Sequence, residues 1–241
     1  SKSRQNIVVI GGARGLAYEI FNNMKLQKGV RLLVIGRGDP ASAELKNNIK
    51  NLKNKYRDFS YVQVDATKIE DLKKVFEKYQ SQWGSIDLVI NSAGIEYSRR
   101  LEEKTLAEIQ LEISTKIVIS KHLQTLKKQF NNEILHFSSI VGEFGNEGQS
   151  TYSLGNGYQA ALSGGTSVMW PGLDQVGMMS NVGLLQMVKT TGATVLPVKQ
   201  ASIWFEQFMQ QEWQEGLVFY ADPKDLLLIE FYVRSFSGYE K

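Results

Sequence analysis

The sequence predicts an α/β fold in which a doubly wound parallel sheet of about seven strands is flanked by helices. Short apolar runs rich in β-branched residues alternate with longer segments rich in lysine, glutamate, glutamine and leucine. This alternation is typical of a parallel sheet that helices cover on both faces. The runs are almost continuously apolar, as expected for strands that are buried on both sides.

Each apolar run is assigned to one strand, and the polar segments between them to helices. The predicted strands are Ile7–Ile10, Leu32–Ile35, Tyr61–Val64, Ile86–Ile90, Ile134–Phe137, Val168–Trp170 and Leu217–Tyr220. The predicted helices include Tyr18–Met24, Ala43–Tyr56, Ile69–Tyr79 and Leu106–Leu126.

Start and stop signals support these boundaries. Asp39-Pro40 is expected to open the second helix, because proline is tolerated in a first turn. Thr67 and Glu70 have the spacing of a capping box for the third helix. Gly84 is expected to end that helix before the fourth strand.

Composition is that of an ordinary globular protein and excludes several functions. The 241 residues are 42% hydrophobic and 22% charged, and residues 1–241 are expected to form a single domain. The absence of cysteine excludes thiol catalysis and thiolate metal sites. His122 and His136 lack metal-ligand spacing, so we interpret them as a helix-surface and a strand residue and expect no metal. A net charge of +3 with scattered lysines disfavours nucleic acid, and no run suits a membrane helix, so we expect a cytoplasmic protein.

The region from about 171 to 215 is less regular. Glycines punctuate short pieces there, and Pro171–Asn181 is a candidate for a lid over a site. An aromatic stripe at helical spacing follows, consisting of Trp204, Phe205, Phe208, Met209 and Trp213. We interpret it as a helix packed on the core rather than as a platform that stacks nucleic-acid bases.

The first strand leads directly into a glycine-rich turn and then a helix. The turn consists of Gly11, Gly12, Ala13, Arg14, Gly15 and Leu16. Glycines let a backbone approach a pyrophosphate, and the helix that follows presents free N–H groups to its charge. Such a turn also serves strand-to-helix geometry alone, but its place after the first strand favours a Rossmann-type dinucleotide site.

The end of the second strand favours NADPH over NADH. A carboxylate there would bind the ribose 2′-hydroxyl of NAD, whereas arginine accommodates a 2′-phosphate. This chain has Arg37 there, and Arg14 in the glycine turn is able to reach the same phosphate. Alternatively, each arginine taken alone is a solvent-exposed charge on a loop. Asp65 ends the third strand, where such folds meet the adenine, and is alternatively a helix cap.

A serine and a tyrosine are expected to converge at the carboxyl ends of the strands. Ser139 ends the fifth strand and Tyr152 follows on the next helix. With the glycine turn and the stretch Asn91-Ser92-Ala93-Gly94, this pair resembles the short-chain dehydrogenase/reductase family. That family ordinarily carries lysine four residues after its tyrosine, where this chain has Asn156.

With asparagine in place of this lysine, the chain resembles a narrower group, the ketoreductase domains of modular polyketide synthases. These domains have asparagine four residues after the tyrosine and carry the lysine on the helix before strand five. Lys116 matches that position. The stretches Phe137–Gly142, Gly148-Gln149 and Tyr152–Asn156, with Trp170-Pro171 and Gly177-Met178, also resemble this group. The resemblance covers roughly Ile7 to Tyr220.

Ketone reduction assigns a role to each of these residues. The alkoxide that hydride transfer creates needs a proton, which Tyr152 is expected to donate while Ser139 hydrogen-bonds the carbonyl oxygen. Lys116 is expected to lower the pKa of Tyr152 from about 10, and Asn156 to orient the lysine or a water chain. Asn91 is expected to brace the loop that contains Ala93 and Gly94. Taken singly, Lys116 and Asn156 are interpreted as ordinary helix residues. The complete set of Lys116, Ser139, Tyr152 and Asn156 favours a catalytic site.

The chain departs from the family pattern in four places. Ala17 replaces the third glycine, and Glu96-Tyr97-Ser98 stands where enzymes that form the D-hydroxyl product carry Leu-Asp-Asp. Phe144 takes the place of the tryptophan of the opposite class, which favours the L-hydroxyl product. The segment 156–170 is shorter than in the family, which puts substrate fit in question. The family's preceding structural subdomain is not in these 241 residues, so we expect a catalytic half.

The resemblance therefore implies NADPH-dependent reduction of a β-ketoacyl thioester carried by an acyl carrier protein, next to other synthase domains. Two alternatives remain open. One is a stand-alone short-chain reductase of a small ketone. The other is a catalytically idle, cofactor-binding scaffold, for which the shortened 156–170 segment is the main argument.

Overall fold

A computed structural model describes residues 4–25, 29–162, 164–174, 195–213 and 216–219. Within these ranges seven parallel strands form one sheet in the order β3-β2-β1-β4-β5-β6-β7. Their bounds are β1 Asn6–Ile10, β2 Arg31–Gly36, β3 Asp58–Gln63, β4 Leu88–Asn91, β5 Glu133–Ser139, β6 Thr166–Trp170 and β7 Gly216–Phe219. The predicted Rossmann-type fold is confirmed, with strand boundaries shifted by up to three residues from the predicted ones.

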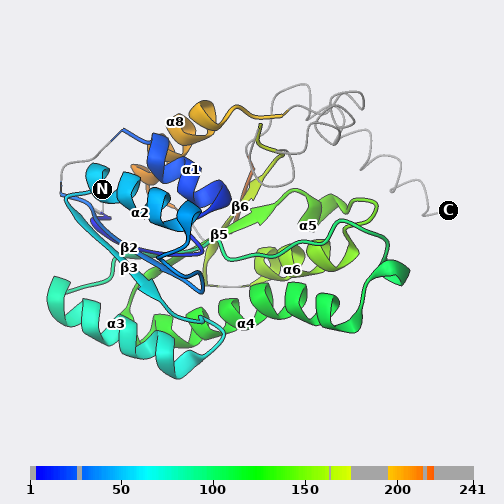
Figure 1. Cartoon of the computed structure of the whole chain (residues 1–241), viewed down its shortest axis with the longest axis horizontal. Helices are drawn as coiled ribbons and strands as arrows, with labels where there is room; N and C mark the ends of the chain where they lie inside the picture. Colours follow the sequence, from blue (N-terminus) through cyan, green and yellow to red (C-terminus); the bar gives the residue numbers. More distant parts are fainter. Residues whose placement is uncertain (1–3, 26–28, 163, 175–194, 214–215, 220–241) are drawn as a thin grey trace.

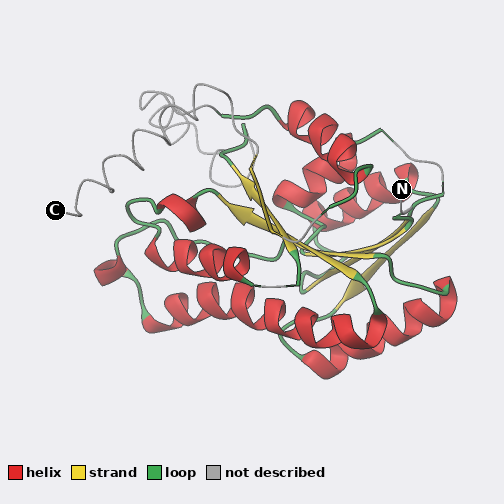
Figure 2. Cartoon of the chain, turned by 180° about the vertical axis from the view of Figure 1, so that it is seen from behind, coloured by secondary structure: helices red, strands yellow, loops and turns green. Residues whose placement is uncertain are grey.

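Helices cover both faces of this twisted sheet (Figures 1 and 2). On one face lie α1 Gly15–Asn23, α2 Ala43–Lys55 and α8 Val198–Met209; on the other lie α3 Ile69–Trp83, α4 Leu106–Phe130 and α6 Ser150–Ala161. Two short helices, η1 Leu101–Glu103 and α5 Val141–Phe144, belong to connecting segments. No helix in the described ranges is long and apolar enough to cross a bilayer.

The aromatic stripe packs on the core, as predicted. Phe205 of α8 is fully buried and meets Phe137 of β5 edge-on, with ring centroids 5.1 Å apart. Phe208 stacks between Trp204 and Trp213, at 5.3 and 4.6 Å. Edge-on and stacked aromatic pairs add to the stabilisation that burial provides, so this stripe anchors α8 to the sheet.

Helices α2 and α3 begin at the predicted residues Ala43 and Ile69, but the two sequence signals proposed to start them are wrong. Helix α2 begins at Ala43, and Ser42 rather than a residue next to Pro40 precedes it. Helix α3 begins after Lys68 without a side-chain cap. The Thr67 hydroxyl donates instead to Asp65, at 2.7 Å, in a turn before the helix. Asx turns of this kind compete with capping for the same side chains.

Other helix ends follow sequence signals. Gly84 ends α3 with φ of 84°, as predicted. Thr105 caps α4 by accepting from the Glu108 N–H, and the Glu108 carboxylate accepts from the Thr105 N–H in return. This capping box was not predicted, although its Thr-x-x-Glu spacing marks it in the sequence. Most of the predicted lid, Pro171–Asn181, lies outside the described residues.

Candidate active site

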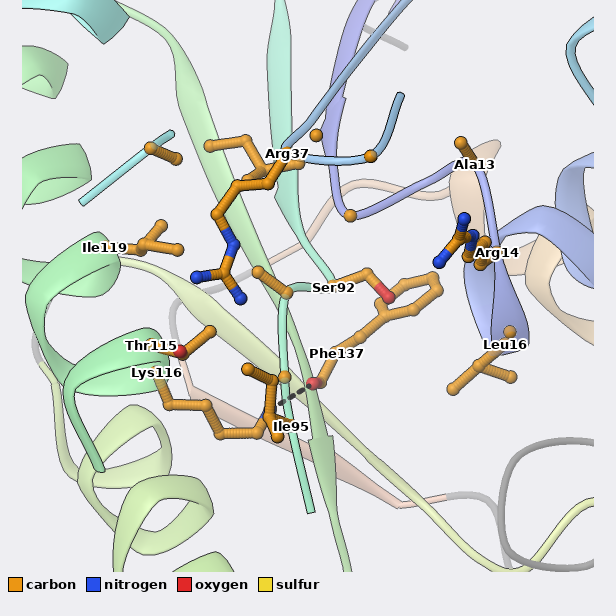
Figure 3. A pocket seen from close by; sticks show the side chains of 18 of the residues that line it. Ala13, Arg14, Leu16, Arg37, Ser92, Ile95, Thr115, Lys116, Ile119 and Phe137 are labelled. Atoms are coloured by element: carbon orange, nitrogen blue, oxygen red, sulfur yellow. Dashed lines mark hydrogen bonds between the residues drawn. The ribbon is translucent and has the colours of Figure 1, made fainter. Parts of the chain in front are cut away.

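A cavity of about 460 Å³ opens at the carboxyl ends of the central strands. It lies where the strand order reverses between β1 and β4, the place at which open α/β sheets bind ligands. Figure 3 shows side chains from several elements converging on it. Eleven predicted site residues line it, namely Gly11, Ala13, Arg14, Gly15, Leu16, Arg37, Asp65, Ala93, Gly94, Lys116 and Tyr152. Gly12, Asn91, Ser139 and Asn156 are not among the lining residues.

The glycine turn is shaped by contacts that exclude larger side chains. A Cβ on Gly11, whose φ is 81°, would lie 2.8 Å from the backbone nitrogen of Ala93. A Cβ on Gly12 would lie 2.5 Å from Cγ1 of Val9, so Gly12 permits the turn to pack on β1. Gly15, with φ of 58°, has open space around its Cβ position. It begins α1, whose first turn no side chain caps in the described structure.

Two arginines and one aspartate are among the residues that line the cavity. In Figure 3 the Arg37 side chain extends along one side and Arg14 lies on the other. Arg14 pairs with Glu44 at 3.3 Å on the surface. Burial raises the pKa of Asp65, but the hydrogen bonds from Thr67 and the charge of Arg37 together outweigh this effect. The pKa of Asp65 therefore lies below its usual value. A carboxylate is thus present beside Arg37.

Asn91, at the end of β4, is fully buried and holds the next loop. Its Oδ1 accepts from the Ala93 N–H at 3.2 Å, and its Nδ2 donates to Ser120 Oγ on α4 at 3.2 Å. These bonds connect the cavity-lining residues Ala93 and Gly94 to the helix that carries Lys116.

Tyr152 lies on α6, lines the cavity and is hydrogen-bonded with Ser139 of β5. Burial and the nearby Glu96 raise the pKa of Tyr152 to about 12, although hydrogen bonding with Asn156 and Ser139 acts in the opposite direction. The predicted lowering of this pKa is therefore wrong for the structure described. The phenol keeps its proton throughout the neutral range, as a proton donor must.

The hydrogen bonds described for the Lys116 ammonium go to groups other than the phenol. Its Nζ donates to the Phe137 carbonyl at 3.3 Å and to Gln159 Oε1 at 3.1 Å, and it lies 5.9 Å from the centroid of the Tyr152 ring. Figure 3 shows the bond from Lys116 to the Phe137 carbonyl. Burial lowers the pKa of Lys116 to about 8.

Asn156 contacts Tyr152 and Ser138 rather than the lysine. Its Nδ2 donates to the Tyr152 carbonyl at 2.8 Å, and its Oδ1 accepts from Ser138 Oγ at 3.3 Å. Among the described side chains, Gln159 is the one that bonds the Lys116 ammonium. Sequence reasoning missed Gln159, although its position seven residues after Tyr152 places both on one helix face.

Sequence reasoning also missed a carboxyl group beside the tyrosine. Glu96 lines the cavity and accepts from Gln149 Nε2 and Ser98 Oγ. Burial raises the pKa of Glu96 even though these hydrogen bonds lower it. Glu96 belongs to the stretch that stands where the family carries Leu-Asp-Asp, but only the folded chain shows that it acts on Tyr152.

A fully buried ion pair fixes the loop that carries Glu96. Lys104 Nζ lies 2.8 Å from Glu112 Oε2, and neither side chain is exposed to solvent. Thr151, the neighbour of Tyr152, accepts from Lys104 at 2.6 Å and donates to Glu112. The other Glu112 oxygen accepts from the Tyr97 N–H at 2.6 Å. The pair thus joins the loop, α4 and the start of α6.

Comparisons with known proteins place the chain in a family. A family model described as the KR domain matches residues 6–169. The chain is 26% identical over 234 residues to the polyketide synthase PksM of Bacillus subtilis, covering 92% of this chain and 6% of that protein. It is 27% identical over 154 residues to the 3-oxoacyl-[acyl-carrier-protein] reductase of Bos taurus, covering 62% of each.

A solved structure of similar fold is the ketoreductase from the first module of phoslactomycin biosynthesis in Streptomyces sp. HK803. It superposes with a TM-score of 0.79 at 22% identity over 90% of this chain. The chain spans about half of that protein, 52%, and a small part of the synthase. With the family model matching well over half of its residues, the chain belongs to the KR domain family.

Proposed function

We propose that the chain catalyses NADPH-dependent reduction of a β-ketoacyl thioester, carried by an acyl carrier protein, to the β-hydroxyacyl thioester. The observation that carries this proposal is that Tyr152, still protonated at neutral pH, lines the cavity and is hydrogen-bonded with Ser139. The proposal takes residues 1–241 as one catalytic domain, with 171–215 as its lid region.

The residues of the cavity suit a dinucleotide. The open Cβ position of Gly15 and the uncapped first turn of α1 leave room and free N–H groups for a pyrophosphate. Gly11 to Leu16 would hold that group, Arg37 a 2′-phosphate, Asp65 the adenine side, and Ala93 and Gly94 the inner half. A bound reduced nicotinamide supplies the hydride.

This chain's own residues supply the proton and the hydrogen bonds. Ser139 would donate to the ketone oxygen, and Tyr152 would transfer its phenolic proton to the alkoxide as the hydroxyl product forms. The tyrosinate left behind is stabilised by the Lys116 ammonium, 5.9 Å from the ring centroid. Asn156 would bond the backbone carbonyl of Tyr152 and the hydroxyl of Ser138, and would thereby fix the tyrosine next to Ser139.

Cofactor preference is expected to depend on Arg37. Arg37→Ala is expected to weaken NADPH binding by about 10- to 100-fold, the value of a charge-assisted hydrogen bond, and to leave NADH binding nearly unchanged. Fluorescence titration with both cofactors measures this. The control is Arg57→Ala. Arg57 is exposed and lies at the amino end of β3, whereas the cavity lies at the carboxyl ends of the strands. Equal weakening of both cofactors would contradict the assignment.

Turnover tests the activity itself. Oxidation of NADPH would be followed by absorbance with a β-ketoacyl thioester on an acyl carrier protein, with its short thioester mimic, and with a small free ketone. We expect the carrier-bound substrate to give the highest kcat/KM and the product to be the L-hydroxyl form, as Phe144 favours. A preference for the free ketone would favour the stand-alone reductase. Cofactor binding without turnover of any substrate would favour the idle scaffold.

The same proposal includes neighbouring synthase domains and a structural subdomain. It is supported by the match of 92% of this chain to 6% of a polyketide synthase, and by the solved ketoreductase of which this chain covers 52%.

A further inference from the structure

A chain of buried polar side chains runs behind the cavity from α6 to β4. Gln159 Oε1 accepts from Lys116 Nζ at 3.1 Å, and Gln159 Nε2 donates to Ser120 Oγ at 3.3 Å. The same Ser120 oxygen accepts from Asn91 Nδ2 at 3.2 Å, and Asn91 Oδ1 accepts from the Ala93 N–H. One glutamine therefore links the lysine of the site to the loop that lines the cavity.

The two helices approach closely enough for this because Gly155 faces the lysine. A Cβ on Gly155 would lie 3.3 Å from Cβ and Cδ of Lys116, so α6 packs directly along the lysine stem. Gln159 follows Gly155 by one helical turn and therefore reaches the end of that stem. Gln159 and Ser120 have no exposed surface, so the bonds form without competition from water.

The charged and titratable groups around Lys116 are bound elsewhere or are neutral, so that a neutral amide is the described side chain that bonds its ammonium. On α6 the ammonium faces the Tyr152 ring. On β5 it faces His136, whose pKa is lowered to about 3 by burial and by the Lys116 charge, so that ring is neutral. On α4 itself Glu112 is bound by Lys104, and in the loop after β4 Glu96 is bound by Gln149.

We propose that Gln159 is a positioning residue that holds the Lys116 ammonium beside Tyr152 and couples it, through Ser120 and Asn91, to the loop of Ala93 and Gly94. Its effect on reduction rests on the proposed function; its hold on the lysine does not. Buried amides that satisfy an ammonium keep it charged, because they replace part of its lost hydration. Gln159 acts through Lys116 and does not touch the reacting atoms.

The test compares Gln159→Met, which removes the acceptor, with Gln159→Glu, which adds a negative charge. The Lys116 charge is followed in the protein without cofactor by NMR titration of ¹³Cε-labelled lysine, with Lys116→Met assigning the signal. We expect a midpoint near pH 8 in the native chain. It should fall in Gln159→Met and rise in Gln159→Glu, because an opposite charge favours the ammonium.

Reduction should change with the same signs. Gln159→Met is expected to lower kcat about tenfold, the value of one hydrogen bond to a charged group, and to move the alkaline limit of activity to lower pH. Gln159→Glu should move that limit to higher pH. Gln124→Met, the same change at an α4 amide whose Nε2 has no partner among the described residues, should alter neither readout.

Unchanged Lys116 midpoints in both Gln159 variants would overturn the inference, whatever the activity. Shifted midpoints in a protein that reduces no ketone would support the hold on Lys116 and refute the proposed function instead. If one variant fails to fold, the midpoint of the other decides, because each has its own predicted sign.

Discussion

Tyr152→Phe is expected to lower the rate of ketone reduction by about 100- to 10,000-fold, the range for loss of a general acid. The change removes one oxygen from a buried side chain and with it the proton that the alkoxide receives. Burial and Glu96 keep that proton in place, since the pKa of Tyr152 is raised to about 12. Single-turnover rates at saturating NADPH and thioester measure the effect.

Tyr158→Phe is the matched control, because Tyr158 lies on the same helix and faces Lys121 rather than the cavity. Its turnover is expected to equal that of the native chain, and cofactor affinity should be unchanged in both variants. Equal turnover by Tyr152→Phe and the native chain would refute the assignment of Tyr152 as the proton donor.

Lys104→Met is expected to lower the free energy of unfolding by about 3–5 kcal/mol, because it leaves the Glu112 carboxylate buried without its cation. Both side chains of this pair are fully buried, with 2.8 Å between Nζ and Oε2. Chemical denaturation measures the loss. Lys73→Met, which removes one partner of an exposed pair 4.0 Å from Glu77, should change stability by less than about 0.5 kcal/mol.

A second substitution separates charge from packing. Lys104→Met with Glu112→Gln removes the unpaired charge while an amide oxygen still accepts from the Tyr97 N–H. The double variant is therefore expected to be more stable than Lys104→Met alone. If it is equally unstable or less stable, the loss comes from packing and the buried charge is not its cause.

Much of the fold follows from local pattern. Apolar runs located all seven strands within a few residues, since strands covered on both faces are largely apolar. The capping signals of the helices were less well predicted, because a polar side chain such as Thr67 can form either a cap or a turn, depending on the surrounding backbone. Asp39-Pro40 was misinterpreted for a similar reason, since Pro40 lies in a turn three residues before α2 begins.

The sequence by itself determined the sheet, the glycine turn at its first strand and the residue types of the site, because these depend on periodicity and on motifs within short stretches. Only the tertiary structure decided how the site is tuned. It turned Lys116 toward Gln159, brought Glu96 to Tyr152 and buried Lys104 with Glu112. Desolvation and contacts between distant segments set these pKa values and bonds, and neither is written in the spacing of residues along the chain.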